Sequence, residues 1–525
     1  MSFLTPLIRS GLFQQQLTPR WRYLFALCAG ALMPLALAPL GIWPLAAIAP
    51  AILAWLCWQQ ESRAIVLSHF FFGLGMFGVG ISWVFVSIHN FGQAPLPLAV
   101  LLTAIFVSFL AAVFSLNGKI LSWKTLQSTH SLALYLVCFC CIWVMGEWLR
   151  SWLLTGFPWL YLGYSQWSTP LAGWAPIFGV FGLSWAILIS GCAVVYILKT
   201  PNAVSRTAAA VIIAGLWLGG HQLQQLNWTS PNDDPIKVAL VQANIPQEKK
   251  WQPSFLMPTL ERYRDLSTQG WQADWLIWPE AAVPMLYHQA SAYLEQTHQQ
   301  ALATNTALIT GILYDDPFER KIYNSANGLG LATGLYHKTR LVPFGEYVPL
   351  EDWLRGLIEF FNLPMSVISA GKDQQAGLQA GAHRIATAIC YEIVYPDLVT
   401  EMAKDRAVIL TISNDAWFGA SWGPLQHLEM AQMRALETGR YVIRATNNGV
   451  SAIISSDGQL QQRSSQFVQK VLLGKVTPMY GSTPFMRWGS SMIVGLCALI
   501  LGLVAVAGYR KNQKKELELV THERV

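Results

Sequence analysis

Charged residues are scarce in this sequence: only 12% of its 525 residues are Asp, Glu, Lys or Arg, whereas 53% are hydrophobic. A soluble globular domain has about a quarter of its residues charged. The shortage excludes an ordinary soluble protein and requires segments that lie in a membrane. The net charge of +6 does not indicate nucleic-acid binding, because the basic residues neither cluster on one predicted helix nor follow a nucleic-acid motif.

Cysteine is almost absent from the polar part of the chain. Cys390 is the only cysteine between residues 230 and 480, so it has no disulfide partner there. The same region lacks the HExxH, GxSxG and CxxC patterns, which makes metal, serine and dithiol chemistry weaker alternatives. A lone thiol is either an inert buried side chain or a reactive group used in catalysis, and the residues around it in the sequence decide between the two.

Long apolar runs account for the missing charge. Crossing the hydrocarbon core of a membrane takes about twenty apolar residues. Runs of roughly this length occur at residues 23–39, 41–58, 64–88, 98–116, 131–146, 174–198, 206–220 and 488–509. We therefore predict a multi-span α-helical membrane bundle of about eight transmembrane helices. Prolines interrupt the first two runs, which also fit a re-entrant hairpin.

The basic residues predict the orientation of these spans, because Lys and Arg beside transmembrane helices concentrate in the cytoplasm. With eight spans, the opposite short loops contain only Arg150. The basic residues of the other side are Arg9, Arg20, Arg22, Arg63, Lys119, Lys124, Lys199, Arg206, Arg510, Lys511, Lys514 and Lys515. This asymmetry predicts that both termini are cytoplasmic and that the polar domain lies in the periplasm, beyond a bacterial inner (cytoplasmic) membrane.

The expected domains follow from the same pattern. They are an N-terminal transmembrane bundle of about seven spans at 1–222, a periplasmic domain at 223–486, a transmembrane helix at 487–509 and a basic cytoplasmic tail at 510–525. Aromatic residues crowd the segment from Glu147 to Trp167, at the outer end of the fifth span. Such crowding favours an interfacial aromatic belt over a lipid-binding pocket.

Within the polar domain, short β-rich runs alternate with helical patterns, which predicts an α/β layered domain. The apolar run RIATAIC ends at Cys390 and is followed by YEIVYPDL, so Cys390 is expected where a strand turns into a helix. Backbone N–H groups at the start of a helix bind developing negative charge. This position favours a nucleophile over an inert thiol.

Two other charged residues follow apolar strands in the same way. Glu280 closes LIWPE, and Lys338 lies in GLYHKTRLVPFGEYVPLE. Alone, each is typical of a solvated surface residue. With Cys390 they supply what acyl transfer through a thiol requires. A carboxylate takes the thiol proton and the thiolate attacks a carbonyl group, while an ammonium lowers the thiol pKa and stabilises the oxyanion.

The motifs around these residues resemble those of the nitrilase (carbon–nitrogen hydrolase) superfamily, which has a Glu, Lys and Cys triad. They are WPEAAVP around Glu280, YHKTRLVPFGEYVP around Lys338, ICYEIVYPD around Cys390 and SNDAWFG from Ser413. Because a multi-span bundle precedes this domain and an anchor follows it, nearly the whole chain resembles the apolipoprotein N-acyltransferase family.

The resemblance implies a nitrilase-like αββα sandwich and a ping-pong reaction without a metal or organic cofactor. The acyl chain of a membrane phospholipid, typically phosphatidylethanolamine, is expected to pass onto Cys390 as a thioester. It would then pass to the α-amino group of the S-diacylglyceryl cysteine that begins an apolipoprotein. The implied partners are this phospholipid, the diacylglyceryl apolipoprotein and the membrane, with no nucleic acid.

The resemblance also implies roles for single residues. Glu280 is the expected general base, Lys338 the oxyanion stabiliser and Cys390 the nucleophile. Glu346, in the matching FGEYVP motif, is expected to support Lys338. Five other residues match positions associated with the active site or its mobile loops, namely Trp251, Arg355, Tyr391, Glu392 and Asn414.

An apolar run, DWLRGLIEFFNLPMSVISAG, follows the Lys338 motif. In a soluble amidase such a run would be a core helix. In a domain tethered to a bilayer at both ends, it favours a lid that dips into the outer leaflet. We expect a lid of this kind to let acyl chains reach Cys390 without crossing water.

Two other functions stay open on this evidence. A membrane-tethered carbon–nitrogen hydrolase would use the same triad with water as the acceptor, but it has no need of seven preceding spans. A transporter with an exported binding domain predicts ionisable residues within the spans, and this chain has almost none there apart from His69.

The predicted orientation is testable with reporter fusions. A reporter that is active only outside the cytoplasm should be active when fused after Gly270 and silent when fused at the C-terminus. The opposite pattern of activities would overturn the orientation derived from the Lys and Arg asymmetry.

Overall fold

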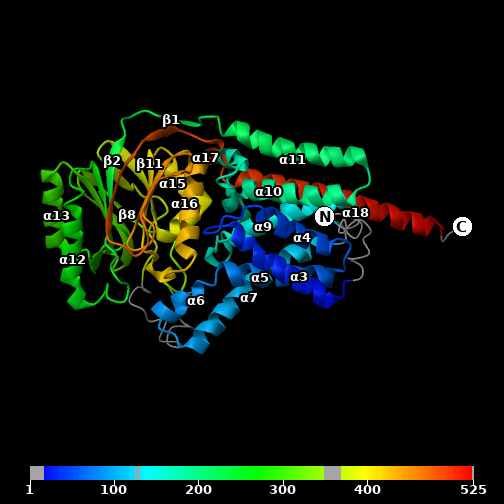
Figure 1. Cartoon of the computed structure of the whole chain (residues 1–525), viewed down its shortest axis with the longest axis horizontal. Helices are drawn as coiled ribbons and strands as arrows, with labels where there is room; N and C mark the ends of the chain where they lie inside the picture. The colour runs from blue at the N-terminus through cyan, green and yellow to red at the C-terminus, as the bar shows by residue number, and fades with distance from the viewer. Residues whose placement is uncertain (1–16, 124–125, 127–130, 348–367, 523–525) are drawn as a thin grey trace. The chain divides into compact units, whose positions relative to one another are not determined.

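The computed structural model describes residues 17–123, 126, 131–347 and 368–522, which belong to two units of the chain (Figure 1). The first unit is Met1–Ser82, Val100–Leu226 and Ser490–Val525, and the second is Trp83–Ala99 and Asn227–Gly489. We expected residues 83–99 to belong to the N-terminal bundle, whereas the structure groups them with the polar domain. Residues 348–367 lie outside the described residues, and they include Arg355 and most of the predicted lid at 352–371.

Apolar helices make up the first unit. They are α3 (Pro19–Leu32), α4 (Leu45–Cys57), α5 (Ser62–Gly80), most of α7 (Leu96–Leu121), α9 (Leu132–Arg150), α10 (Ala175–Lys199), α11 (Ala203–Leu223) and α18 (Ser491–His522). Helix α3 packs along α5, and α10 packs against α4, α9 and α11. Short 3₁₀ turns connect some of them at Met33–Ala36, Leu153–Thr155, Leu162–Gln166 and Pro170–Trp174.

Six helices within the described ranges are long and apolar enough to cross a membrane. They are Ser62–Gly80, Leu96–Leu121, Leu132–Arg150, Pro170–Lys199, Ala203–Leu223 and Ser491–Lys511. The other two predicted spans correspond to α3, with 14 residues, and α4, with 13. Helix α3 passes after Leu32 into the 3₁₀ turn Met33–Ala36, where Pro34 has no N–H group to continue the α-helical hydrogen bonds. The structure therefore supports six candidate spans and does not confirm the predicted eight.

The aromatic segment at the end of α9 is largely buried. Trp159, Tyr161 and Tyr164 are 1%, 0% and 1% exposed, so the prediction of an interfacial belt is wrong for them. Two buried charged side chains of α9 bind the irregular backbone here. The Glu147 carboxylate accepts a hydrogen bond from the N–H of Leu162 at 2.9 Å, and Arg150 donates to the Trp159 carbonyl at 2.8 Å. Non-helical backbone inside a membrane protein needs such partners.

One seven-stranded sheet of the second unit has the strand order β14-β13-β12-β11-β10-β9-β7. Its strands are β7 (Ala332–Thr333), β9 (Leu378–Ala380), β10 (His383–Ile389), β11 (Val408–Ser413), β12 (Tyr441–Thr446), β13 (Ala452–Ile454) and β14 (Leu460–Arg463). Strands β10, β11 and β12 are parallel to one another. Their carboxyl ends therefore meet at one edge of the sheet.

The other seven-stranded sheet has the order β15-β2-β3-β5-β6-β8, with β4 paired to β5. Its strands are β2 (Ile236–Gln242), β3 (Trp275–Ile277), β4 (Val283–Leu286), β5 (Ala307–Asp315), β6 (Ile322–Gly330), β8 (Leu335–His337) and β15 (Lys470–Val476). Strands β2, β3 and β5 are parallel. A separate two-stranded sheet pairs β1 (Thr229–Pro231) with β16 (Met479–Gly481).

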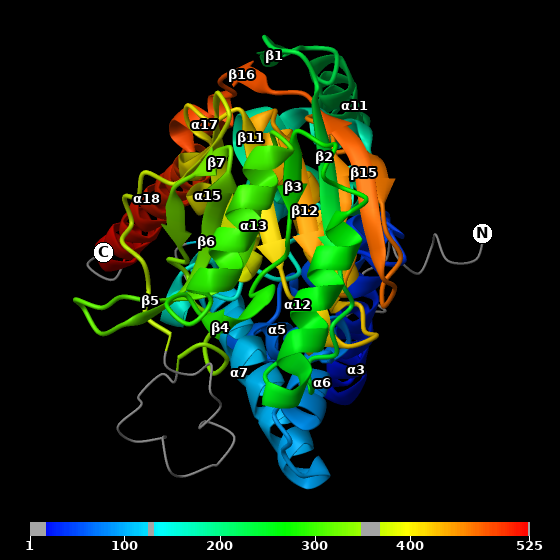
Figure 2. The ribbon, with the colours of Figure 1, turned by 90° about the vertical axis from the view of Figure 1, so that its left-hand side faces the viewer.

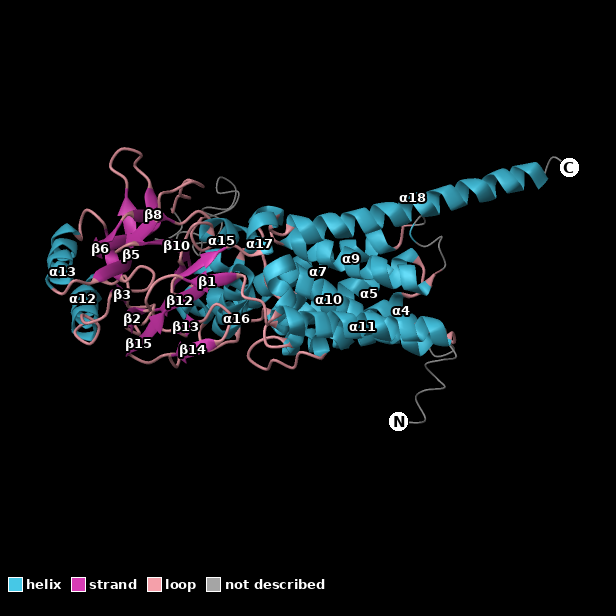
Figure 3. Ribbon diagram, turned by 90° about the horizontal axis from the view of Figure 1, so that it is seen from above, coloured by secondary structure: helices cyan, strands magenta, loops and turns pink. Residues whose placement is uncertain are grey.

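Helices cover the outer faces of both large sheets, which gives four layers (Figure 3). Helices α12 (Pro253–Ser267) and α13 (Ser291–Ala303) lie in front of β2 and β3 in Figure 2. Helices α15 (Pro396–Ala403) and α16 (Gly423–Thr438) pack on β10 and β12 of the other sheet, and α17 (Pro484–Trp488) packs against both. The predicted α/β layered domain is confirmed.

The alternation of side chains along the strands separates two hydrophobic cores. In β2, Val238 and Leu240 face the core between the sheets, where they join Ile385 of β10 and Leu410 of β11. The intervening Ala239 and Val241 face α12 and α13, and pack with residues such as Leu260 and Leu294. Successive side chains of a strand point to opposite faces, so both faces of β2 are buried.

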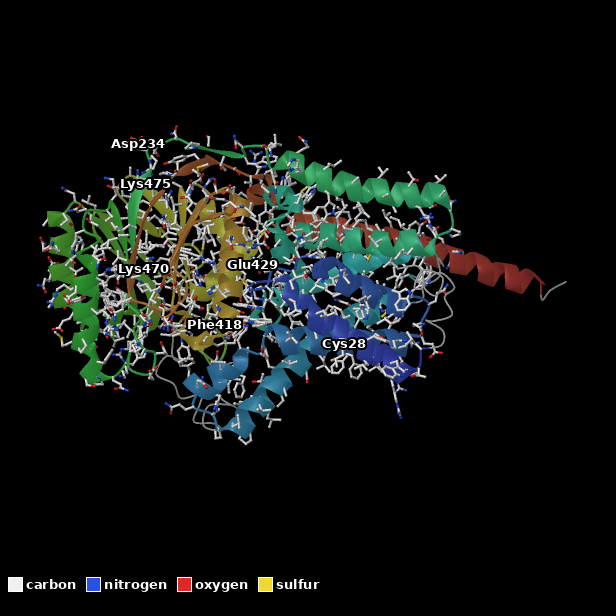
Figure 4. The ribbon with its side chains drawn as sticks, viewed as in Figure 1. Cys28, Asp234, Phe418, Glu429, Lys470 and Lys475 are labelled. Carbon is white, nitrogen blue, oxygen red and sulfur yellow. The ribbon has the colours of Figure 1, made fainter. Side chains whose placement is uncertain are left out.

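The segment Trp83–Ala99 forms a short helix, α6 (Val84–Val86), and a π-helical turn, Ser87–Phe91. It packs on the 3₁₀ turn Asp415–Phe418 that follows β11. The ring of Trp83 meets that of Phe418, labelled in Figure 4, edge to face at 4.7 Å between centroids. The Ser87 hydroxyl donates to the Trp417 carbonyl at 2.7 Å. These contacts tie the segment to the carboxyl end of β11.

Candidate active site

The three residues of the predicted triad each follow the carboxyl end of a strand. Glu280 comes after β3, Lys338 directly after β8, and Cys390 directly after β10. Glu280 and Lys338 are buried, with 7% and 1% exposure, while Cys390 is partly buried against the core between the sheets. The fold thus brings together side chains that are up to 110 residues apart in the sequence.

Lys338 sits between two carboxylates. Its Nζ atom lies 3.0 Å and 2.9 Å from the two carboxylate oxygens of Glu346 and 3.6 Å from Oε1 of Glu280. The side-chain amide of Asn324 joins the two carboxylates, donating to Glu280 at 2.7 Å and to Glu346 at 2.8 Å. Burial alone would lower the pKa of Lys338, but the Glu346 and Glu280 carboxylates more than offset it and raise this pKa above the ordinary lysine range. Lys338 is therefore a permanent cation.

The other carboxylate oxygen of Glu280 accepts a hydrogen bond from the backbone N–H of Asn414 at 2.8 Å. Behind Glu280, Gly311 of β5 donates its N–H to the Pro279 carbonyl at 3.2 Å. A Cβ atom at residue 311 would lie 2.6 Å from the Cα atom of Glu280. Only glycine allows the β5 backbone to approach the Glu280 backbone this closely.

Cys390 adopts a positive φ of 53°, which is uncommon outside glycine. It begins the 3₁₀ turn Cys390–Val394, so the sharp change of direction comes at the predicted junction between strand and helix. Such strained non-glycine positions cluster at functional sites. The Ser413 hydroxyl oxygen lies 3.5 Å from the Cys390 sulfur.

Burial raises the pKa of the Cys390 thiol, the Glu280 carboxylate raises it further, and the Lys338 ammonium lowers it. We expected a nearby ammonium to lower the thiol pKa. Lys338 has this effect, but burial and Glu280 outweigh it. The resting site therefore holds a protonated thiol, and the thiolate forms only when a base accepts the proton.

Glu392, two residues after Cys390, is fully buried and binds the Lys338 loop to the Cys390 turn. Its carboxylate accepts five hydrogen bonds of 2.7 to 3.2 Å, from the backbone N–H groups of Thr339, Arg340 and Ile389 and the hydroxyls of Thr339 and Tyr336. Because these donors flank Lys338 on one side and Cys390 on the other, Glu392 fixes the two residues relative to each other.

A buried polar network that sequence reasoning missed lies behind Cys390. The Nε2 atom of His427 lies 3.1 Å from the Cys390 carbonyl, and its Nδ1 atom lies 3.1 Å from Arg444 and 3.2 Å from the Asp415 carboxylate. Arg444 also donates to the Asp415 carboxylate at 2.6 Å, and Ser413 donates to the same carboxylate. Burial alone would raise the pKa of Asp415, but Arg444 and His427 hold it below the ordinary range. Only Ser413 and Asp415, within SNDAWFG, belonged to a motif noted in the sequence.

The other predicted site residues differ in their surroundings. The Asn414 side chain donates to the Gln247 carbonyl oxygen at 2.7 Å, which ties the end of β11 to the loop after β2. Trp251 is partly buried in that same loop. Tyr391 is 8% exposed and packs edge to face on Tyr395.

The described residues contain no group of three or more His, Cys, Asp or Glu side chains that could hold a metal ion.

Comparisons with known proteins identify the family. The model of the apolipoprotein N-acyltransferase N-terminal domain matches residues 29–193, and the carbon–nitrogen hydrolase model matches residues 237–485. An apolipoprotein N-acyltransferase of Azotobacter vinelandii is 46% identical over 486 residues, which are 91% of this chain and 94% of that protein. The chain belongs to the apolipoprotein N-acyltransferase family. A Pseudomonas aeruginosa protein of that name is 42% identical, with 95% of this chain and 98% of that protein covered.

Among solved structures, the nitrilase-superfamily protein Nit3 of Saccharomyces cerevisiae matches 48% of this chain and 93% of its own. The sequence identity is 18% and the TM-score 0.36.

Family membership confirms the predictions of an acyltransferase and of a nitrilase-like carbon–nitrogen hydrolase fold in the polar domain. The relatives extend over more than nine-tenths of the chain, and so include the apolar helices as well as the sheets. The enzyme is thus a membrane-associated acyltransferase that acts on lipoproteins, and a stand-alone hydrolase is less well supported.

The close approach at Gly311 predicts a sensitive position. Gly311→Ala should push the Glu280 backbone away and lower acyl transfer on the order of a hundredfold, as expected for a misplacement of about 1 Å. Gly215→Ala in α11 is the control, because no atom lies within 4 Å of its added Cβ. Transfer rates and thermal unfolding of both variants check this. Wild-type activity in Gly311→Ala would show that Glu280 needs no such support.

Proposed function

We propose that the enzyme transfers an acyl chain from a membrane phospholipid to an apolipoprotein through a thioester on Cys390. Three features support Cys390 as the nucleophile: its strained backbone at the end of β10, the charges of Glu280 and Lys338 that act on its thiol, and its place in the matched carbon–nitrogen hydrolase region. The observation that carries the proposal is the Lys338 ammonium held between Glu280 and Glu346 beside this thiol.

In the first half-reaction, the Glu280 carboxylate takes the proton of the Cys390 thiol, and the thiolate attacks the ester carbonyl of the phospholipid. A C–S bond forms, and negative charge develops on the carbonyl oxygen, where the Lys338 ammonium stabilises it. The C–O bond then breaks. The departing lysophospholipid oxygen takes the proton from Glu280, which returns to the carboxylate form.

In the second half-reaction, the α-amino group of the diacylglyceryl cysteine attacks the thioester carbonyl. Glu280 accepts a proton from the attacking nitrogen, the C–S bond breaks as the amide forms, and the departing sulfur takes the proton back. The same carboxylate therefore serves both steps. Glu346 keeps Lys338 in place, and Glu392 keeps the Lys338 loop on the Cys390 turn.

The remaining roles rest on the family resemblance. We assign Trp251, Tyr391, Asn414 and Arg355 to substrate binding or to the loops around the site. The proposed donor is phosphatidylethanolamine, and the acceptor is the S-diacylglyceryl cysteine at the start of an apolipoprotein.

We also propose that residues 1–222 and 487–509 span the inner membrane, about eight times in all, with residues 223–486 in the periplasm and the tail 510–525 in the cytoplasm. The six apolar helices support this arrangement. Whether the two short N-terminal helices cross the membrane changes the number of crossings but not the side on which the catalytic domain lies. Five or seven crossings before the catalytic domain both place it opposite a cytoplasmic N-terminus.

The covalent intermediate gives the decisive experiment. Incubation with phospholipid alone should leave one acyl chain on the protein, because the thioester forms before the amine acceptor arrives. Mild hydroxylamine should release this chain. Cys390→Ala should form no adduct, and Cys390→Ser should be nearly inactive, since a hydroxyl is far less acidic than a thiol. Intact-mass and peptide mass spectrometry locate the adduct.

Addition of a peptide that begins with diacylglyceryl cysteine should then discharge the enzyme and acylate the α-amino group of the peptide. An adduct on another residue would refute the assignment of Cys390. Discharge to free fatty acid alone would instead indicate a membrane-tethered carbon–nitrogen hydrolase.

Substitution of either charged partner of the thiol should slow acylation, but for different reasons. Glu280→Gln removes the proton acceptor. Lys338→Ala removes oxyanion stabilisation worth about 3 kcal/mol, or roughly a hundredfold in the acylation rate. Single-turnover acylation of each variant tests this, with thermal unfolding to show that the protein remains folded. A wild-type acylation rate in either variant would show that the substituted residue takes no part in the acylation step.

A further inference from the structure

A second lysine reaches the active site from the loop that follows β2. Lys250 is only 2% exposed, and its Nζ atom donates to the backbone carbonyl of Glu280 at 3.2 Å. The same loop is tied to the site again by Gln247, which accepts from the Asn414 side chain. Among the described residues, the Lys250 ammonium donates to the Glu280 carbonyl and has no carboxylate within ion-pair distance.

Burial of an ammonium without a carboxylate partner costs folding free energy, so a buried lysine of this kind indicates a role other than stabilising the fold. Burial lowers the pKa of Lys250 to about 8, and the negative charges of Glu280 and Cys390 act in the opposite direction. In the described part of the chain, these two are the titratable groups that act on Lys250. At neutral pH, Lys250 is therefore still mostly charged.

The charge balance of the site shows what this cation can do. When Glu280 has taken the thiol proton, the core of the site holds the Cys390 thiolate, the Glu346 carboxylate and the Lys338 ammonium. The sum is one net negative charge in a buried setting, where unbalanced charge is costly. The ammonium of Lys250 brings this sum to zero. The resting site, with the Glu280 carboxylate and a neutral Cys390 thiol, has the same sum. Loss of the thiol proton to solvent adds one further negative charge, which a neutral side chain at residue 250 would leave less compensated.

We propose that Lys250 is a positioning residue that holds the Glu280 backbone and supplies the second cation that stabilises the Cys390 thiolate. This inference rests on the proposed role of Cys390 as the nucleophile. It differs from the role of Lys338, which is paired with two carboxylates and keeps its charge at all working pH values. Lys250 has no such pairing in the described residues, so its charge, and with it the reactivity of the thiol, changes with pH.

The test is the pH dependence of Cys390 alkylation by iodoacetamide, measured on the full-length protein in detergent between pH 6 and pH 10. The reaction is quantified on the Cys390 peptide by mass spectrometry, because Cys28 on α3 (Figure 4) is exposed and can also react. Below the thiol pKa, the alkylation rate of an isolated thiol rises tenfold per pH unit. The wild-type protein should rise less steeply above about pH 8, because Lys250 loses its charge there and the thiol pKa increases.

Substitutions at residue 250 should change this profile in opposite ways. Lys250→Met should alkylate at least about tenfold more slowly than wild type at pH 7 and rise with a constant slope, because an opposite charge at close range shifts a pKa by about one unit or more. Lys250→Arg should keep the wild-type rate at pH 7. Its profile should rise with a constant slope above pH 8, because arginine keeps its charge there and the bend of the wild-type profile is lost. Lys249→Met is the matched control, because Lys249 is exposed and its side chain lies over the Phe255 ring. Its profile should follow wild type.

A straight wild-type profile, or a wild-type rate in Lys250→Met, would overturn the proposal. The wild-type profile needs no substitution, so a failure of Lys250→Met to fold would not remove the test. If Lys250→Met reacted more slowly but kept the wild-type change of slope, that change would come from another group, and the role of Lys250 would be purely structural. The outcome is separate from that of the proposed function: an acyl adduct on Cys390 with a straight profile rejects only Lys250, whereas an adduct elsewhere rejects the nucleophile itself.

Discussion

The interaction on which the site depends is the contact of the Lys338 ammonium with two buried carboxylates. Glu280 and Glu346 both accept from the Asn324 amide, so they lie close together, and two like charges at this range repel each other unless a cation lies near both. The Lys338 ammonium is that cation, at 2.9 Å from Glu346 and 3.6 Å from Glu280.

The same cluster explains why the thiol is protonated at rest. The negative charge of Glu280 opposes a second negative charge on Cys390, and burial opposes it too. A change that removes the charge of Glu280 would therefore make the thiolate easier to form. In the protonated form, a thiol reacts far more slowly with oxidants and electrophiles than a thiolate does.

Sequence reasoning selected three residues that follow predicted strands, because together they supply the chemistry of acyl transfer through a thiol although none of them is decisive alone. Glu280, Lys338 and Cys390 were found in this way, and the α/β alternation predicted the layered domain. Asn324 could not be found, because an amide within a strand looks the same whether it binds a carboxylate or water. Lys250 was also missed, since a lysine in a polar loop beside Lys249 gives no sign that its side chain is buried.

The membrane-facing half was less predictable for a physical reason. Apolar length alone does not distinguish a full span from a shorter helix, and Pro34 divides the first run into two pieces. The aromatic segment after α9 suggested an interface by composition, although its rings fill the interior. Burial of Trp159 and Tyr161 depends on Glu147 and Arg150 binding the backbone around them, and a list of residue types does not show such contacts.

The membership of Trp83–Ala99 in the second unit has a practical meaning for anyone who wishes to isolate the chemistry from the membrane. A fragment that starts at Asn227 would lack the rings of Trp83 and Phe91, and would leave Phe418 and Trp417 bare beside the network that holds the Cys390 carbonyl. Such a fragment would carry all three triad residues and still be incomplete. A soluble version of this enzyme has to graft that segment back onto the turn after β11.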